Sequence, residues 1–197
     1  MNKLSISGIK KLRDLTGAGF LDCKEALENC GLDIDKAIEF LRKKGVSTAE
    51  KKKDRTANEG LIAISKDQSN KEASIIEINS ETDFVARNKN FQNFVFNLSK
   101  INLDQKGNLD KLMKSKYNNE ENVSDALTNL ISKIGENLTI RRCKYINIDN
   151  GFIGTYVHNV EKDDMGKIGV LLSVKTDIDF SLINDFLKKM CMHIAAT

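Results

Sequence analysis

Proline is absent from the 197 residues, and only two residues, His158 and His193, are histidines. No stretch approaches the roughly 18 apolar residues that a membrane-spanning helix needs, and the opening residues lack the apolar core of a signal peptide. Four cysteines form no CxxC pair and have no histidines at zinc-ligand spacing. These absences exclude a membrane span, a zinc finger and most histidine-based mechanisms. They predict a cytoplasmic protein with reduced thiols and no bound metal.

Motifs for catalysis are also missing. There is no Walker-type phosphate loop, no GxGxxG turn and no HExxH pair. Cys23 and Cys30 lie on the apolar stripe of an expected helix, where a buried thiol is inert. Cys143 stands between Arg142 and Lys144, and two interpretations stay open: a thiol with a lowered pKa, or an ordinary position in a strand. The sequence predicts a protein that is not an enzyme and holds no cofactor.

The charge balance points to a protein partner. The chain has 31 Lys/Arg against 28 Asp/Glu, a net charge of +3, and the excess lies in residues 1–60, which carry 13 basic and 10 acidic residues. A nucleic-acid binder usually shows a dominant basic face. With 40% hydrophobic and 30% charged residues, the composition is that of an ordinary globular protein. We therefore expect contact with a protein surface and no direct contact with nucleic acid.

Residues 1–45 predict a three-helix bundle. The first helix begins near Ser5 or Ser7, and the glycine-rich turn at 17–19 follows it. A second helix ends at Gly31, and Asp33 has the character of an N-cap for a third helix that Gly45 ends. Apolar residues recur at i, i+3, i+4 and i+7 in the second helix. Because such a core is small, it gains stability from a partner or a neighbouring domain.

Residues 46–59 have no apolar periodicity and predict an exposed linker. The basic residues of this segment are Lys51, Lys52, Lys53 and Arg55. Binding of RNA by this basic run is the alternative interpretation, and it predicts a steep dependence on salt.

From residue 60 onward the pattern changes to alternating strands and helices. Short β-branched runs at 61–64 and 73–78, separated by KDQSN, predict a hairpin. Helices are expected from Asn88, over 108–114, over 124–134 and at the end of the chain, where Ile183, Phe186, Leu187, Met190 and Ile194 share a pattern. Strands are expected at 138–148, 151–157 and 167–175. The predicted fold class is α+β, with antiparallel strands and helices.

A weak internal repeat divides this core. The stretches 78–84 and 174–180 both follow an expected hairpin and precede an expected helix, and both end in Asp-Phe. We therefore expect a first core subdomain at 60–137 and a second at 138–197.

The pair Asp83-Phe84 lies between a predicted strand and the helix that Asn88 caps. One interpretation places Phe84 in the core beneath that helix. The other makes Phe84 a protruding aromatic beside a carboxylate, the kind of side chain that anchors a protein interface. Periodicity does not separate the two.

Four parts of the sequence carry specific motifs: LRDLTGAG at 12–19 with DCK at 22–24, TDFVARN at 82–88, KIGEN at 133–137 with IRR at 140–142, and MHIAA at 192–196. Together they resemble bacterial elongation factor Ts, the guanine-nucleotide exchange factor for elongation factor Tu. They occur in the family's order and span nearly the whole chain. TDFVARN is the most specific.

The resemblance implies a fold and a set of contact residues. It implies an N-terminal three-helix domain similar to ubiquitin-associated domains, joined to an α+β core with a pseudo-repeat. The residues that it assigns to the G domain of elongation factor Tu are Arg13, Phe20 and Leu21. The residues that it assigns to a loop beside the partner's magnesium site are Thr82, Asp83, Phe84 and Val85. It assigns His158 to the second half of the core, facing the partner's other domains.

The function implied by the resemblance is exchange of guanine nucleotide during translation elongation in the cytoplasm. The factor would bind elongation factor Tu in its GDP-bound and nucleotide-free states, promote GDP release by disturbing the magnesium and nucleotide site, and allow GTP reloading. Longer members continue after the MHIAA segment, so residues 138–197 are expected to be an incomplete subdomain. Truncation, stability of this half alone, and completion by a second copy in a homodimer all stay open. A general interaction module that does not affect elongation factor Tu is the rival hypothesis.

Overall fold

The computed structural model describes residues 5–119 and 121–197 and combines helices with antiparallel strands, which confirms the α+β class. Its contacts divide the chain into two units. The helical unit comprises the described residues up to Arg55 together with Asp125–Asn137, and the sheet unit comprises Thr56–Ser124 and Leu138–Thr197. In the described residues, no helix is both long and apolar enough to cross a membrane.

The helical unit contains the three predicted N-terminal helices, α1 (Ile6–Thr16), α2 (Phe20–Asn29) and α3 (Ile34–Lys52). The Ser5 side chain accepts a hydrogen bond from Gly8 N, which confirms a helix start near Ser5. The Asp33 side chain accepts one from Lys36 N, so the predicted cap at Asp33 is confirmed. Gly17 ends α1 with φ of 68°, a left-handed conformation that favours glycine. The buried core residues of this bundle are Ile9, Leu12, Cys23, Ala26, Leu27 and Ala37.

The predicted end of the third helix at Gly45 is wrong, because α3 continues to Lys52. Gly45 is buried within the helix, and a Cβ atom there would lie 3.5 Å from the Cβ atom of Ser132 in α6 (Val123–Ile134). Gly45 is therefore a buried interior position of α3, within ordinary contact distance of α6, and it does not end the helix. As a consequence, residues 46–52 of the expected linker are helical, and only the segment after Lys53 connects to the first strand.

The end of α6 is bound to the end of α3. The Asn137 side chain is 4% exposed, and its Nδ2 donates to the carbonyl oxygens of Lys53 at 3.2 Å and Arg55 at 2.7 Å. The ammonium group of Lys52 donates to the carbonyl oxygen of Gly135. These contacts provide donors for carbonyl groups that follow the ends of both α3 and α6.

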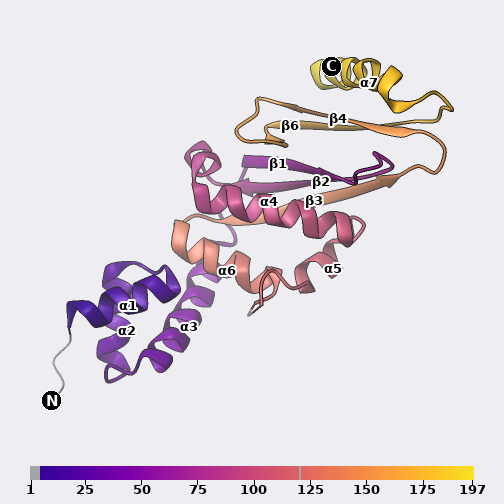
Figure 1. The fold of residues 1–197 in the computed structure, drawn as a ribbon. Helices are drawn as coiled ribbons and strands as arrows, with labels where there is room; N and C mark the ends of the chain where they lie inside the picture. Colours follow the sequence, from indigo (N-terminus) through magenta and orange to yellow (C-terminus); the bar gives the residue numbers. More distant parts are fainter. Residues whose placement is uncertain (1–4, 120) are drawn as a thin grey trace. The chain divides into compact units, whose positions relative to one another are not determined.

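The sheet unit is layered (Figure 1). The larger sheet has the order β3-β2-β1-β5, formed by β1 (Glu59–Lys66), β2 (Glu72–Ser80), β3 (Leu138–Asn147) and β5 (Met165–Gly166). On one side lie α4 (Lys89–Asp104) and the short α5 (Leu109–Lys114). On the other side lie β4 (Phe152–His158) and β6 (Ile168–Val174), a two-stranded antiparallel sheet, with α7 (Phe180–Ala196) outermost.

The predicted hairpin is confirmed, since β1 and β2 pair antiparallel. β3 pairs with β2, so the strand that begins at residue 138 completes the sheet of the first predicted subdomain. The division into domains at 1–45, 46–59, 60–137 and 138–197 stays a prediction.

Two glycines allow the second sheet to pack on both faces. A Cβ atom at Gly169 would lie 2.6 Å from Ile62 Cδ1 and 2.7 Å from Ile75 Cδ1, so a side chain at this position would require the ends of these two isoleucines to shift. A Cβ atom at Gly154 would lie 2.9 Å from the Cβ atom of Leu187 in α7. Each glycine thus marks a close contact between layers.

Three of the four cysteines are buried. Cys23, Cys143 and Cys191 are buried, Cys30 is half-buried, and all four are free. Burial raises the pKa of the three buried thiols above the ordinary value. The Cys143 thiol donates to the carbonyl oxygen of Gly107 at 3.2 Å. Of the two interpretations of Cys143, the structure therefore supports the inert position in a strand.

We expect Cys30 to react with a thiol reagent such as DTNB about tenfold or more faster than the other three cysteines at pH 8, because burial restricts access and disfavours the thiolate. The measurement is the time course of labelling in native buffer, with Cys30→Ser as the control that removes the fast phase. Unfolding in urea should make all four thiols react alike. Labelling of Cys143 as fast as Cys30 in the folded protein would contradict this assignment.

We expect Asn137→Ala to lower the free energy of unfolding by about 1–3 kcal/mol, because two carbonyl groups lose their donor. Urea unfolding followed by circular dichroism measures the change. Asn29→Ala is the matched control, since Asn29 is an exposed asparagine of the same unit. Equal stability of the two variants would show that the Asn137 contacts contribute nothing.

Candidate functional site

Phe84 protrudes from the sheet unit. It lies in the short 3-10 helix η1 (Asp83–Arg87), which connects β2 to α4. Phe84 is 77% exposed, whereas Val85 is 5% and Ala86 is 1% exposed. The interpretation that Phe84 fills the core is therefore wrong, and the neighbouring residues fill it instead. We refer to residues 80–88 as the Phe84 loop.

The Phe84 loop is held at both ends by hydrogen bonds. On the strand side, the Ser80 hydroxyl donates to the carbonyl oxygen of Thr82 at 2.9 Å, and Ser80 is fully buried. On the helix side, Asn88 caps α4 as predicted, because its Oδ1 accepts from the backbone N–H groups of Asn90 and Phe91. The Gln92 side chain donates to the carbonyl oxygen of Ala86 at 2.9 Å. The loop is thus a defined turn that presents one aromatic ring.

The four residues predicted for this loop divide into two groups. Asp83 and Phe84 are both exposed, so a carboxylate and an aromatic ring of neighbouring residues are open to solvent. Thr82 is half-buried, and its carbonyl takes part in the loop's hydrogen bonds. Val85 is buried, so its side chain supports the loop from inside and does not meet a partner directly. An exposed aromatic on a rigid turn is suited to insertion into a pocket of another protein.

A second apolar surface surrounds the turn between α1 and α2 in the helical unit. Phe20 is 45% and Leu21 is 77% exposed, and Arg13 is an exposed base in the last turn of α1. Leu15, also near the end of α1, is 60% exposed, and the sequence analysis did not select it as a contact residue. Its position at the edge of the α1 apolar stripe did not distinguish a buried residue from an exposed one. We call Arg13, Leu15, Phe20 and Leu21 the turn surface.

His158 ends β4 and is exposed. Its Nδ1 lies 3.1 Å from the Tyr156 hydroxyl, and the two rings are 6.1 Å apart. The structure therefore places His158 on the second sheet of the sheet unit, whereas the Phe84 loop follows the larger sheet.

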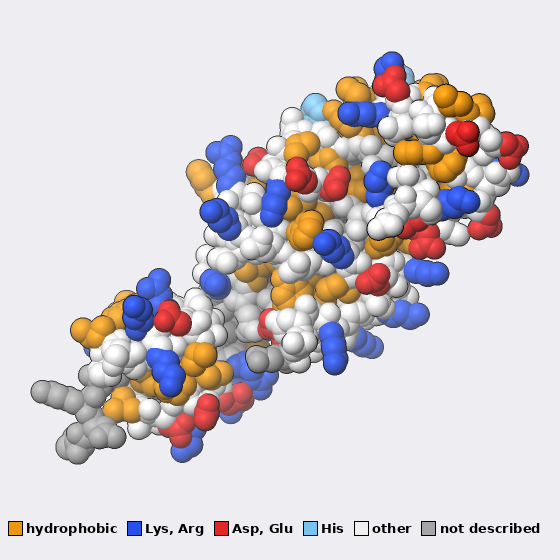
Figure 2. Space-filling view, in the orientation of Figure 1, with side chains coloured by type: hydrophobic (Ala, Val, Ile, Leu, Met, Phe, Trp, Pro, Cys, Tyr) orange, Lys and Arg blue, Asp and Glu red, His pale blue; other side chains and the backbone are white. Residues whose placement is uncertain are grey.

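Much of the apolar surface of the helix α7 is exposed. Of the five apolar residues that predicted this helix, only Leu187 is buried, and Cys191 is buried as well. The exposed apolar residues of α7 are Leu182, Phe186, Met190, Met192 and Ile194. Figure 2 shows apolar side chains gathered among charged ones over this end of the sheet unit. The predicted last helix is therefore present, and three of the residues that predicted it, Phe186, Met190 and Ile194, are exposed.

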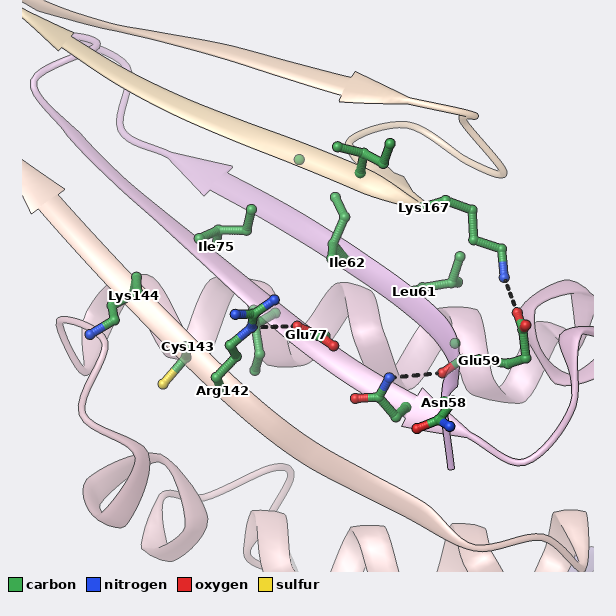
Figure 3. A pocket seen from close by; sticks show the side chains of 15 residues that line it. Asn58, Glu59, Leu61, Ile62, Ile75, Glu77, Arg142, Cys143, Lys144 and Lys167 are labelled. Atoms are coloured by element: carbon green, nitrogen blue, oxygen red, sulfur yellow. Dashed lines mark hydrogen bonds and ion pairs between the residues drawn. The ribbon is translucent and has the colours of Figure 1, made fainter. Parts of the chain in front are cut away.

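A groove of about 510 Å³ lies against the larger sheet beside β6 (Figure 3). Four of its charged residues form two pairs, since Glu77 contacts Arg142 at 2.5 Å and Glu59 contacts Lys167 at 3.0 Å. Burial raises the pKa of Glu77, but the hydrogen bond from Arg142 and the charges of both arginines at 141 and 142 lower it more, so this pKa lies below its ordinary value. None of the predicted site residues lines the groove.

The described residues contain no cluster of three or more His, Cys, Asp or Glu side chains that could hold a metal ion. At the predicted positions, most of the exposed side chains are apolar or charged. The candidate sites are therefore defined by their exposed apolar and charged side chains.

The comparisons with known proteins agree with the motifs. The family model described as elongation factor TS matches residues 81–197. The chain is 44% identical over 195 residues to elongation factor Ts of Bartonella bacilliformis, 41% over 198 residues to that of Rhizobium leguminosarum bv. trifolii, and 43% over 195 residues to that of Mesorhizobium japonicum. These matches cover 98%, 100% and 98% of this chain but 63%, 64% and 63% of the relatives. The chain thus spans less than two thirds of their length, and it belongs to the elongation factor Ts family.

Proposed function

We propose that this chain is a guanine-nucleotide exchange factor that binds elongation factor Tu in its GDP-bound form and accelerates GDP release during translation elongation. Family membership supports the role, and the observation that carries it is the 77% exposure of Phe84 on a turn whose neighbours Val85 and Ala86 are buried. The proposal places the activity in the cytoplasm and requires no cofactor. Bond-breaking chemistry has no part in it.

Such a factor works by differential binding. It binds the nucleotide-free partner more tightly than the nucleotide-bound partner, and this difference weakens the bound nucleotide. Coupling is reciprocal, so excess GTP expels the factor and leaves a reloaded partner. Each tenfold gain in release rate requires a barrier lower by about 1.4 kcal/mol, and a thousandfold gain requires roughly 4 kcal/mol.

The Phe84 loop has the features to supply most of this energy. One fully desolvated aromatic contributes about 2 kcal/mol or more at an interface. The carboxylate of Asp83 beside the partner's magnesium site competes for hydrogen bonds of the metal shell and repels phosphate. Insertion of both residues favours the partner's nucleotide-free state.

The turn surface has a different role in this proposal. Arg13, Phe20 and Leu21 contact the G domain and provide affinity, together with Leu15. His158 contacts the partner's other domains. Because the turn surface is apolar around one base, its burial contributes to binding before and after nucleotide release alike.

The proposal is tested by measuring how fast labelled GDP leaves elongation factor Tu, by stopped flow, with and without this chain. A general interaction module would leave the release rate unchanged. RNA binding by Lys51, Lys52, Lys53 and Arg55 is the second alternative, and it would appear as RNA affinity that falls steeply with salt.

We expect Phe84→Ala to lower the maximal rate of GDP release by about thirtyfold, the equivalent of about 2 kcal/mol. Asp83→Ala should lower it by about threefold to tenfold, because a charged hydrogen-bonding group is lost. Phe186→Ala, which removes a 56% exposed aromatic of α7, is the control. Release at the unmutated rate with either loop variant would refute the role given to that residue.

We expect Leu21→Ala to raise the factor concentration that gives half-maximal acceleration by about tenfold, with a smaller effect on the maximal rate, because burial of a leucine contributes to affinity in both states. The same stopped-flow titration separates the two quantities. Ile6→Ala removes an equally exposed side chain from the other end of α1 and serves as the control. A loss confined to the maximal rate would contradict the affinity role of the turn surface.

A further inference from the structure

Gln92 holds the helix-side end of the Phe84 loop, and we infer that it is a positioning residue for Phe84. This inference rests on the proposed exchange function. Its structural basis is the hydrogen bond from Gln92 Nε2 to the carbonyl oxygen of Ala86, 2.9 Å long and partly buried. Gln92 itself is half-buried in α4, and it is not among the residues assigned to the partner contact.

The loop needs such a contact because η1 is short. A 3-10 helix of five residues leaves most of its carbonyl groups without partners inside the helix. The backbone N–H of Asn88 donates to the Val85 carbonyl at 2.9 Å, and the Ser80 hydroxyl donates to the Thr82 carbonyl. The Ala86 carbonyl belongs to a residue that is only 1% exposed, and Gln92 supplies its donor. The turn is therefore fixed by one side chain from the strand and one from the helix.

The geometry of α4 makes position 92 suitable. Gln92 lies one turn after the cap, and its backbone N–H donates to the carbonyl oxygen of Asn88 at 2.9 Å. Side chains on a helix point back toward its N-terminus, so the Gln92 amide reaches the segment that precedes α4. The helix is anchored by buried residues, among them Phe91, Phe94 and Val95. Gln92 thus connects the loop to a rigid element of the core.

Loss of this contact changes function without removing any partner contact. A loop that samples several arrangements must be ordered when it binds, which lowers the fraction of encounters that place Phe84 productively. We therefore expect Gln92→Ala to lower the maximal rate of GDP release by about threefold to tenfold. Gln92→Glu keeps the size of the side chain but loses the amide donor, and it should lower the rate as well.

The test is a double-mutant cycle on GDP release from elongation factor Tu, with Gln92→Ala, Phe84→Ala and the double variant. If Gln92 acts through Phe84, its replacement lowers the rate in the unmutated chain and has little further effect in the Phe84→Ala background. Asn93→Ala, an exposed neighbour on α4, is the control and should retain the full rate. In the free protein, hydrogen exchange of the backbone amides of 83–87 should be faster with Gln92→Ala than with Asn93→Ala.

The outcomes separate this inference from the proposed function. An unchanged release rate with Gln92→Ala, or an equal loss in both backgrounds, overturns the positioning role and leaves the proposed function intact. A Phe84→Ala variant that releases GDP at the unmutated rate overturns the loop mechanism itself. Unchanged amide exchange at 83–87 also overturns the positioning role, because the loop would then be equally ordered without Gln92.

Discussion

The burial of Val85 and Ala86, two residues of the short helix η1, is the constraint on which the candidate site depends. With about three residues per turn, adjacent side chains of a 3-10 helix point in well-separated directions. Once Val85 and Ala86 are packed against the core of the sheet unit, Phe84 is directed outward. An aromatic ring in solvent gains nothing for folding, so its position is set by the packing of its neighbours, and the proposed function gives it a use in contact with another molecule.

Two glycines of the sheet unit mark close contacts between its layers. Gly154 lies against Leu187 of α7, and Gly169 lies against Ile62 and Ile75 of the larger sheet. Close packing of this type is rigid, because interiors tolerate little change in volume. The proposed mechanism needs this rigidity, since a flexible support would yield when the loop meets the nucleotide site of a partner.

Affinity and rate are assigned to different parts of the chain in the proposed mechanism. The turn surface belongs to the helical unit, and the Phe84 loop belongs to the sheet unit. Contacts that are equal before and after nucleotide release strengthen the complex, but only contacts that are stronger in the nucleotide-free state accelerate release. A factor with both kinds of surface captures its partner through one and changes the partner's nucleotide affinity through the other.

Local signals in the sequence determined the caps at Ser5, Asp33 and Asn88, the first hairpin and the α+β class, because capping, turn formation and periodicity act within a few residues. The motifs by themselves indicated the family. Only the tertiary structure decided that α3 passes through Gly45 and that Phe84 points outward. Both outcomes depend on atoms distant in the chain: Ser132 packs against Gly45, and the strands and α4 provide the core that accepts Val85. The periodicity of one segment does not show which of its residues a second segment will bury. Packing between segments therefore decided the burial of these residues.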